Sequence, residues 1–226
     1  MENLRPNEKR AKNAIILIWI VLIAHTILAI SSYFEYDLLQ DFVDGAKVST
    51  ETAKANDMRQ MILGVIFLVV WVISGVTFIQ WFRRAYYNLS LKVQHLSNSD
   101  GWAAGSWFVP LINFYLPYQM MRELYHETKV LLIDKGVTLT EELSTKFVGW
   151  WWALFIVSSI FGQVMFQYSR HAETIDDLIT ISILQMITFV FKIPWAIITV
   201  KVIKDYSKIE TLMLEIKDEE EALISE

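Results

Sequence analysis

The stretch Met61–Trp81, MILGVIFLVVWVISGVTFIQW, carries no charged side chain, and it decides the fold class of the chain. A helix needs about 20 apolar residues to cross ~30 Å of hydrocarbon. Three further runs reach that length, at residues 14–33, 147–168 and 178–202, in a chain of which 54% is hydrophobic. The sequence therefore predicts an all-α integral membrane protein with four transmembrane helices.

The basic residues predict the direction of each crossing, because cytoplasmic loops near span ends are rich in Lys and Arg. Four precede the first span, seven lie between the second and third, and further lysines follow Val200. The first outward connection is instead acidic, with six carboxylates between residues 34 and 60. We expect both chain ends, residues 1–13 and the tail 203–226, to be cytoplasmic. In sequence they flank a membrane domain at 14–202. An alternative makes residues 1–31 a signal peptide, because a basic start and an apolar run precede Ala29-Ile30-Ser31.

A shorter apolar segment, residues 101–118, does not fit a simple crossing. Pro110 and Pro117 interrupt it, and a crossing here would move Arg122 and Lys146 to the outer side, against the charge bias. Exposed backbone is not tolerated within lipid. We therefore predict a Pro-broken segment on the cytoplasmic side that is either re-entrant or interfacial.

Three motifs in and around this segment carry a resemblance: WFRRAYYNL at 81–89, GWAAGSWFVPLIN at 101–113 and PYQMMREL at 117–124. In this order and spacing, they closely resemble the bacterial membrane family catalogued as domain of unknown function 4328. The resemblance covers about residues 61–202. It implies a multi-span helical fold, here in the bacterial inner (cell) membrane, and it implies no activity.

The family-like motifs also contain the candidate ligand or lipid site. We expect six polar side chains to converge at the cytoplasmic membrane boundary: Arg83, Arg84, Asn88, Asn113, Gln119 and Arg122. In one interpretation they fasten the broken segment to the second span, with Asn113 capping backbone groups that the prolines leave unpaired. In the other they form an anion site, because arginine offers a planar fork suited to phosphate.

Two ionisable residues fall inside predicted spans, where they are costly and often functional. His25 lies near the middle of the first span, as a neutral imidazole bonded to another helix or as a functional group. Lys192 lies past the centre of the fourth span, two residues before Pro194. It either snorkels toward the headgroups or pairs with a freed carbonyl, or it faces a pathway or ligand.

No catalytic group, metal site or cofactor is predicted. The four histidines are scattered without metal-ligand spacing, and the chain has no cysteine, phosphate-binding glycine loop or nucleophile elbow. Gly64 and Gly75 share a face of the second span and predict close helix packing. In the tail, apolar residues recur at spacings of three and four, typical of a coiled coil or of an amphipathic helix lying on its own protein.

Three hypotheses for function follow. The first is a non-enzymatic bundle whose cytoplasmic face engages lipid headgroups or a protein partner. The second is an oligomeric channel or small transporter, with the broken segment as a re-entrant cytoplasmic gate and Lys192 facing the pore. A lipid-modifying enzyme ranks third. The expected partners are membrane lipids and either a second copy or another membrane protein, with no nucleic acid.

Overall fold

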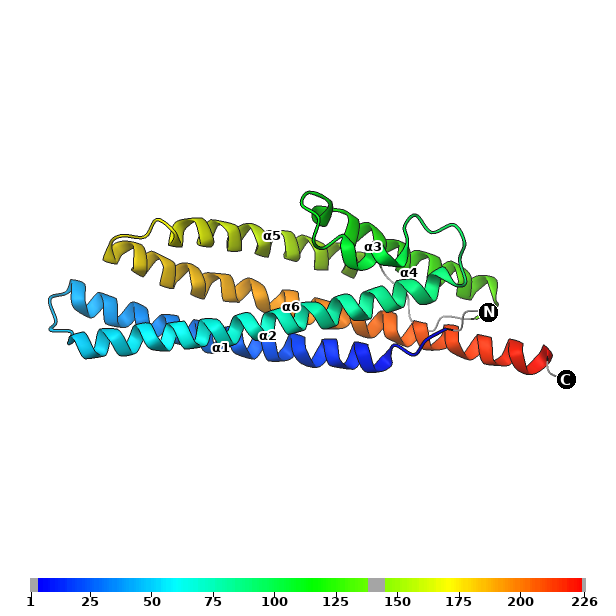
Figure 1. Ribbon diagram of the computed structural model, residues 1–226, viewed down its shortest axis with the longest axis horizontal. Helices are drawn as coiled ribbons and strands as arrows, with labels where there is room; N and C mark the ends of the chain where they lie inside the picture. Colours follow the sequence, from blue (N-terminus) through cyan, green and yellow to red (C-terminus); the bar gives the residue numbers. More distant parts are fainter. Residues whose placement is uncertain (1–3, 138–144, 225–226) are drawn as a thin grey trace. The chain divides into compact units, whose positions relative to one another are not determined.

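The computed structural model describes residues 4–137 and 145–224, with side chains described as far as Met213. The described part consists of helices joined by loops and contains no strand (Figure 1). Its elements are α1 Glu8–Val43, α2 Thr50–Ser90, α3 Asp100–Gly105, the 3₁₀ turn η1 Ile112–Phe114, α4 Leu116–Asp134, α5 Lys146–Ser169 and α6 Ile175–Ile224. The predicted all-α class is confirmed.

Four of these helices are long and apolar enough to cross a membrane: α1, α2, α5 and the part of α6 from Ile175 to Met213. Each contains one of the four apolar runs expected from the sequence. In α2 only 6% of the most apolar 18-residue window is buried inside the protein. Apolar side chains left this exposed are unfavourable in water.

The chain divides into two compact units. Unit 1 comprises residues 1–16, 75–152 and 198–226, and unit 2 comprises residues 17–74 and 153–197. Unit 1 therefore collects the N-terminal segment, the long middle connection and the tail, which are the three parts predicted to be cytoplasmic. Unit 2 contains most of the apolar runs and the two connections predicted to face outward.

Unit 1 has a core of aromatic side chains. Trp81 packs against Tyr206 at a ring separation of 6.2 Å, and Phe78 packs against Trp151 at 5.9 Å. Trp81 and Trp151 are 0% and 1% exposed. Tryptophan commonly settles at the membrane interface, but both of these side chains are buried by protein. Aromatic burial of this kind is among the largest packing contributions to stability.

The tail forms a helix, as the sequence predicts, because α6 continues to Ile224 without a break. Its apolar residues Val202, Tyr206, Ile209 and Met213 are all buried in unit 1. The Tyr125 hydroxyl on α4 donates to the Val202 carbonyl oxygen at 2.6 Å. Over these residues the tail lies on its own protein, which decides between the two interpretations of its spacing.

The Pro-broken segment 101–118 folds as short pieces instead of one helix. It contains α3 and η1, and Pro117 occupies the first turn of α4, where the missing N–H costs nothing. Leu111 joins the pieces with a φ of 67°, a conformation that favours glycine. The chain turns here because helix cannot continue through Pro110.

The two glycines of α2 have no close neighbour in the described part of the chain. A Cβ atom built at Gly64 or at Gly75 would meet nothing within 4 Å among the described residues. The predicted role of these glycines in close helix packing is therefore wrong.

Candidate functional site

A buried carboxylate lies in the middle of unit 1. Glu210 of α6 is 3% exposed, although it lies beyond the end of the fourth apolar run in a segment rich in charged residues. It occupies the apolar face of the helix because it follows the buried Tyr206 by four residues. A buried charge is costly unless hydrogen bonds or a partner compensate it.

Two amides, from two other segments of unit 1, compensate Glu210. The Asn7 Nδ2 amide donates to both carboxylate oxygens, at 3.2 and 3.0 Å, and the Asn88 Nδ2 amide donates to Oε1 at 2.7 Å. Asn7 also donates to the Trp81 carbonyl at 3.2 Å, and Asn88 exchanges hydrogen bonds with the backbone of Arg5 at 2.9 and 3.0 Å. One carboxylate thus ties the N-terminal segment, α2 and α6 together.

Burial raises the pKa of Glu210 to about 7. The hydrogen bonds from the two amides, and the positive charge of the nearby Arg84, keep this pKa from rising further. Glu8 adds a weaker upward shift by repulsion. The Asn7 Oδ1 atom is buried and accepts no hydrogen bond within the described part of the chain. A proton on Glu210 would have an acceptor there once the Asn7 amide rotated, so the cluster accommodates both protonation states.

Three arginines gather beside this cluster. Arg84 is half-buried on α2, and burial together with the neighbouring Arg10 and Arg5 lowers its pKa. Arg5 lies over the ring of Tyr87, 4.7 Å from the centroid, and the Arg10 guanidinium donates to the Gln80 carbonyl at 3.0 Å. Like charges held this close repel one another. The arrangement suits an anion that would neutralise all three.

The structure places two of the six predicted site residues at the Glu210 cluster and the other four elsewhere in unit 1. Arg84 and Asn88 lie beside Glu210, on one face of α2 as their spacing predicts. Arg83 is instead exposed and pairs with Asp100 at 3.2 Å. Asn113 lies within η1, and both Gln119 and Arg122 are exposed on α4. Convergence of the whole set, and its role in ligand binding, stay predictions.

The side-chain oxygen of Asn113 makes no capping contact in the described residues, and the capping role stays a prediction. Asn113 Oδ1 is buried without a hydrogen-bond partner in the described residues. Its backbone N–H donates to the Val109 carbonyl at 3.0 Å. A backbone N–H thus satisfies the carbonyl of the residue before Pro110.

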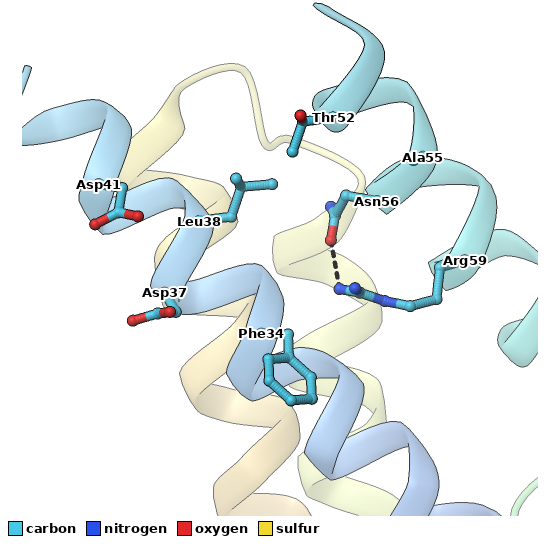
Figure 2. A pocket seen from close by; sticks show the side chains of 8 residues that line it. All are labelled: Phe34, Asp37, Leu38, Asp41, Thr52, Ala55, Asn56 and Arg59. Atoms are coloured by element: carbon cyan, nitrogen blue, oxygen red, sulfur yellow. Dashed lines mark hydrogen bonds between the residues drawn. The ribbon is translucent and has the colours of Figure 1, made fainter. Parts of the chain in front are cut away.

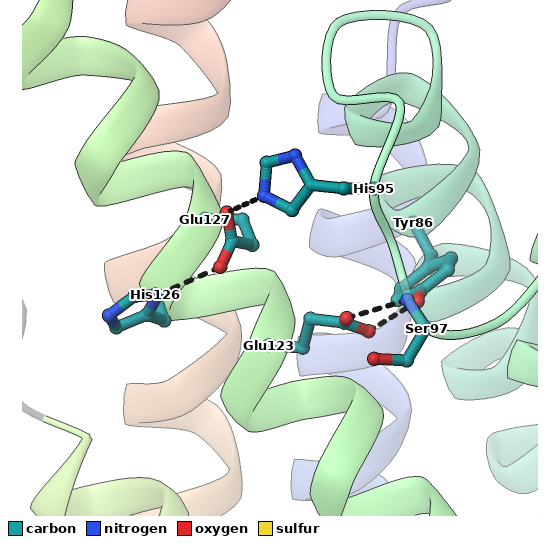
Figure 3. Close-up of polar contacts among 6 residues, drawn as sticks. All are labelled: Tyr86, His95, Ser97, Glu123, His126 and Glu127. Atoms are coloured by element: carbon teal, nitrogen blue, oxygen red, sulfur yellow. Dashed lines mark hydrogen bonds and ion pairs between the residues drawn. The ribbon is translucent and has the colours of Figure 1, made fainter.

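A second cluster of polar side chains fastens the connection 91–99 to α4 (Figure 3). The Glu127 carboxylate lies between His95 Nε2 and His126 Nδ1, each 2.9 Å away. The Glu123 carboxylate accepts from the Tyr86 hydroxyl at 2.5 Å and from the Ser97 amide at 2.8 Å. No group of His, Asp or Glu in the described residues has the arrangement of a metal site. The contacts fix a loop on a helix.

An exposed apolar loop completes unit 1. Phe108 and Leu111 are 74% and 77% exposed, and Phe114 and Tyr115 are about half exposed. The Trp152 indole N–H, near the start of α5, donates to the Phe114 carbonyl at 3.1 Å. The loop is therefore attached near the start of the third apolar run, yet Phe108 and Leu111 remain largely exposed.

The two ionisable residues of the predicted spans both belong to unit 2. Lys192 is half-buried, with its Nζ atom 6.0 Å from the centroid of the Trp195 ring. The His25 ring packs on Phe67 at 4.4 Å. These contacts leave the alternatives stated for each residue open.

Fold and site together define a class: an all-helical chain with four helices suited to crossing a membrane. The chain belongs to the family described as Domain of unknown function (DUF4328), which matches residues 44–208. The resemblance seen in the three motifs is thereby confirmed over a longer range. Comparison with curated proteins and with solved structures finds no match.

Proposed function

We propose that this is a multi-pass protein of the cell membrane whose unit 1 lies at the cytoplasmic surface and binds an anionic phospholipid headgroup. The arginine cluster of Arg5, Arg10 and Arg84 is the observation that carries the lipid proposal. Arg10 lies just before the apolar run that begins at Ala14, and Arg84 lies just after the run that ends at Trp81. Both guanidinium groups thus emerge at headgroup depth if these runs cross the bilayer.

The topology is supported by the hydrogen bonds around Glu210. They join Asn7 before the first apolar run, Asn88 after the second and Glu210 after the fourth. Three segments that contact one another directly must lie on one side of a membrane. The excess of basic residues in these segments favours the cytoplasmic side.

The exposed loop supports the same location. Phe108, Leu111 and Phe114 are large apolar side chains, and the Phe114 carbonyl is bonded to α5 at its start. Apolar and aromatic groups next to a span end gain free energy by entering the headgroup and acyl boundary. The loop would hold unit 1 against the bilayer, and the arginines would select an anionic lipid.

Neighbouring arginines provide a matched experiment. Arg84→Gln removes one member of the cluster, whereas Arg83→Gln removes an exposed guanidinium paired with Asp100. Each full-length variant is purified from membranes in mild detergent, and native mass spectrometry measures the anionic phospholipid that it retains. We expect wild type and Arg83→Gln to retain lipid and Arg84→Gln to lose most of it.

Folding is checked by thermal unfolding of the same samples. Arg84→Gln relieves repulsion from Arg5 and Arg10 while losing attraction to Glu210, so its melting temperature should change little. Equal lipid retention by Arg83→Gln and Arg84→Gln would remove the proposed headgroup site. A collapse in melting temperature would instead assign Arg84 a fastening role.

The alternative function, an oligomeric channel or small transporter, rests on Lys192 and on the broken segment. Lys192 is half-buried in unit 2 and lacks a carboxylate partner among the described residues. Such a side chain is a common feature of ion pathways. The alternative predicts ion flux in liposomes that changes with Lys192→Met, and unchanged flux would exclude that role.

A further inference from the structure

Unit 2 contains a pocket of about 480 Å³ between the end of α1 and the beginning of α2 (Figure 2). Phe34 and Leu38 of α1 and Ala55 of α2 contribute its apolar wall. Its volume falls within the range of pockets that hold small organic molecules. The pocket lies wholly within unit 2 and shares no residue with the arginine cluster of unit 1.

Arg59 of α2 lines the pocket in a fixed orientation. Its Nε atom donates to Ser31 Oγ at 3.1 Å, and its Nη2 atom donates to Asn56 Oδ1 at 2.6 Å and to the Ser31 carbonyl at 3.4 Å. Asn56 is itself only 7% exposed, so the guanidinium is held by a buried neighbour. All these acceptors are neutral, and no carboxylate of the described residues forms an ion pair with Arg59.

Two carboxylates, Asp37 and Asp41, lie one helical turn apart on α1, where they also line the pocket. Both are exposed, and neither has an ion-pair partner in the part of the chain that the structure describes. Glu35 lies near Arg59, but its oxygens accept hydrogen bonds from Gln60 Nε2 at 3.0 Å and from Ser182 Oγ at 3.1 Å. Glu35 thus has its own partners.

The pocket therefore presents a fixed cation on α2 and two unpaired carboxylates on α1. A simple anion would be attracted by Arg59 and repelled by the two aspartates, and a simple amine would meet the reverse arrangement. A molecule with both charges satisfies both helices. We infer that this pocket binds a small zwitterion, with its phosphate or carboxylate at Arg59 and its ammonium group at Asp37 and Asp41.

Ammonium-phosphate chemistry can come from a free metabolite or from an aminophospholipid headgroup, and two probes separate these sources. Isothermal titration calorimetry of the full-length protein in detergent measures binding of O-phosphoethanolamine and of dihexanoyl phosphatidylethanolamine. Binding of both would show that the headgroup is sufficient. Binding of the short-chain lipid alone would identify the lipid as the source, and either result supports the pocket.

Two variants test the two charges, and each has a matched control. Arg59→Gln is compared with Lys54→Gln, an exposed cation on the same helix, and Asp37→Asn/Asp41→Asn is compared with Asp44→Asn. Loss of one charge-assisted contact should raise the dissociation constant about tenfold or more. The controls should bind like wild type.

Several results would overturn the inference. One is that wild type binds neither probe, and another is that inorganic phosphate or ethylamine alone binds as tightly as the zwitterion. Equal affinities of the pocket variants and their controls would also exclude the site. Circular dichroism of Arg59→Gln separates lost binding from lost folding, and the aspartate variants alter exposed side chains that leave the helix contacts intact. None of these results depends on lipid retention by unit 1.

Discussion

Replacing Glu210 with glutamine should remove a specific pH dependence of stability. Burial raises the pKa of this carboxyl to about 7 in the folded protein, from an ordinary value of 4.5. Between pH 4.5 and about 7, the folded state therefore keeps a proton that the unfolded state has released. The resulting stabilisation is complete below pH 4.5 and is lost as the pH rises through about 7.

The size of the effect follows from the same shift. Each pKa unit corresponds to ~1.4 kcal/mol, so the difference between 4.5 and about 7 is worth on the order of 3 kcal/mol in the free energy of unfolding. Arg84 attracts the ionised form and Glu8 repels it, and both contributions are included in this shift. Ionising Glu210 costs the folded state this free energy because the charged carboxylate is buried away from water, although the amide hydrogen bonds of Asn7 and Asn88 favour the charged form.

Glutamine has nearly the shape of the protonated carboxyl and does not titrate. Its oxygen can accept from Asn88, and its amide can donate to Asn7 Oδ1 once the Asn7 amide rotates, since that oxygen has no partner in the described residues. We expect Glu210→Gln to exceed wild type by less than ~1 kcal/mol near pH 5 and by up to ~3 kcal/mol near pH 8. The matched control, Glu51→Gln, replaces an exposed carboxylate on α2 and should follow wild type.

The assay is unfolding in mixed micelles of mild detergent and SDS, followed by tryptophan fluorescence at pH 5, 6, 7 and 8. Parallel pH profiles for wild type and Glu210→Gln would show that Glu210 does not cause the pH dependence of the free energy of unfolding. A variant that is equally destabilised at every pH would show that glutamine cannot replace the carboxylate, and the Asn7 acceptor would then have no role.

Three further predictions concern unit 1. Trp152→Phe removes the indole donor to Phe114 and should cost ~1 kcal/mol while speeding amide exchange at residues 112–116; the exposed neighbour change Trp150→Phe should do neither. Tyr125→Phe removes the buried bond to the Val202 carbonyl and should lower the unfolding free energy by ~1 kcal/mol; a change under a third of this in SDS titration would exclude a structural role for the hydroxyl. Leu111→Gly relieves a positive φ and should raise the free energy of unfolding in detergent by ~1 kcal/mol. The same change should weaken attachment of the loop to liposomes, measured with a fluorophore attached at Phe108→Cys.

The helices could be predicted from the sequence because their cause is local. Uncharged runs such as Met61–Trp81 are long enough to cross a bilayer whatever they pack against, and the four helices carry the runs at the expected places. The tail helix followed in the same way from its Lys, Glu and Leu content and from the absence of Gly and Pro. The family was likewise evident from three motifs in order.

The candidate site was predicted only in part because its geometry depends on contacts distant in sequence. Arg84 and Asn88 share a helix face, so their spacing placed them together. Glu210 and Asn7 were missed, since a glutamate in a charged tail and an asparagine near the chain start both suggest solvated residues. One signal was present: Glu210 follows Tyr206 by four residues on the apolar face of the tail. The burial of Trp81 could not be predicted either, because sequence does not distinguish a lipid-facing tryptophan from a buried one.

The central claim is that the N-terminal segment, the middle connection and the tail lie together on the cytoplasmic side. The chain has no cysteine, so single cysteines introduced at Lys9, Ser97, Lys208 and Lys47 can each be labelled alone. In intact cells, a membrane-impermeant maleimide should label Lys47→Cys and leave the other three unlabelled until the membrane is permeabilised. Labelling of Lys9→Cys, Ser97→Cys or Lys208→Cys from outside, or protection of Lys47→Cys, would contradict the account.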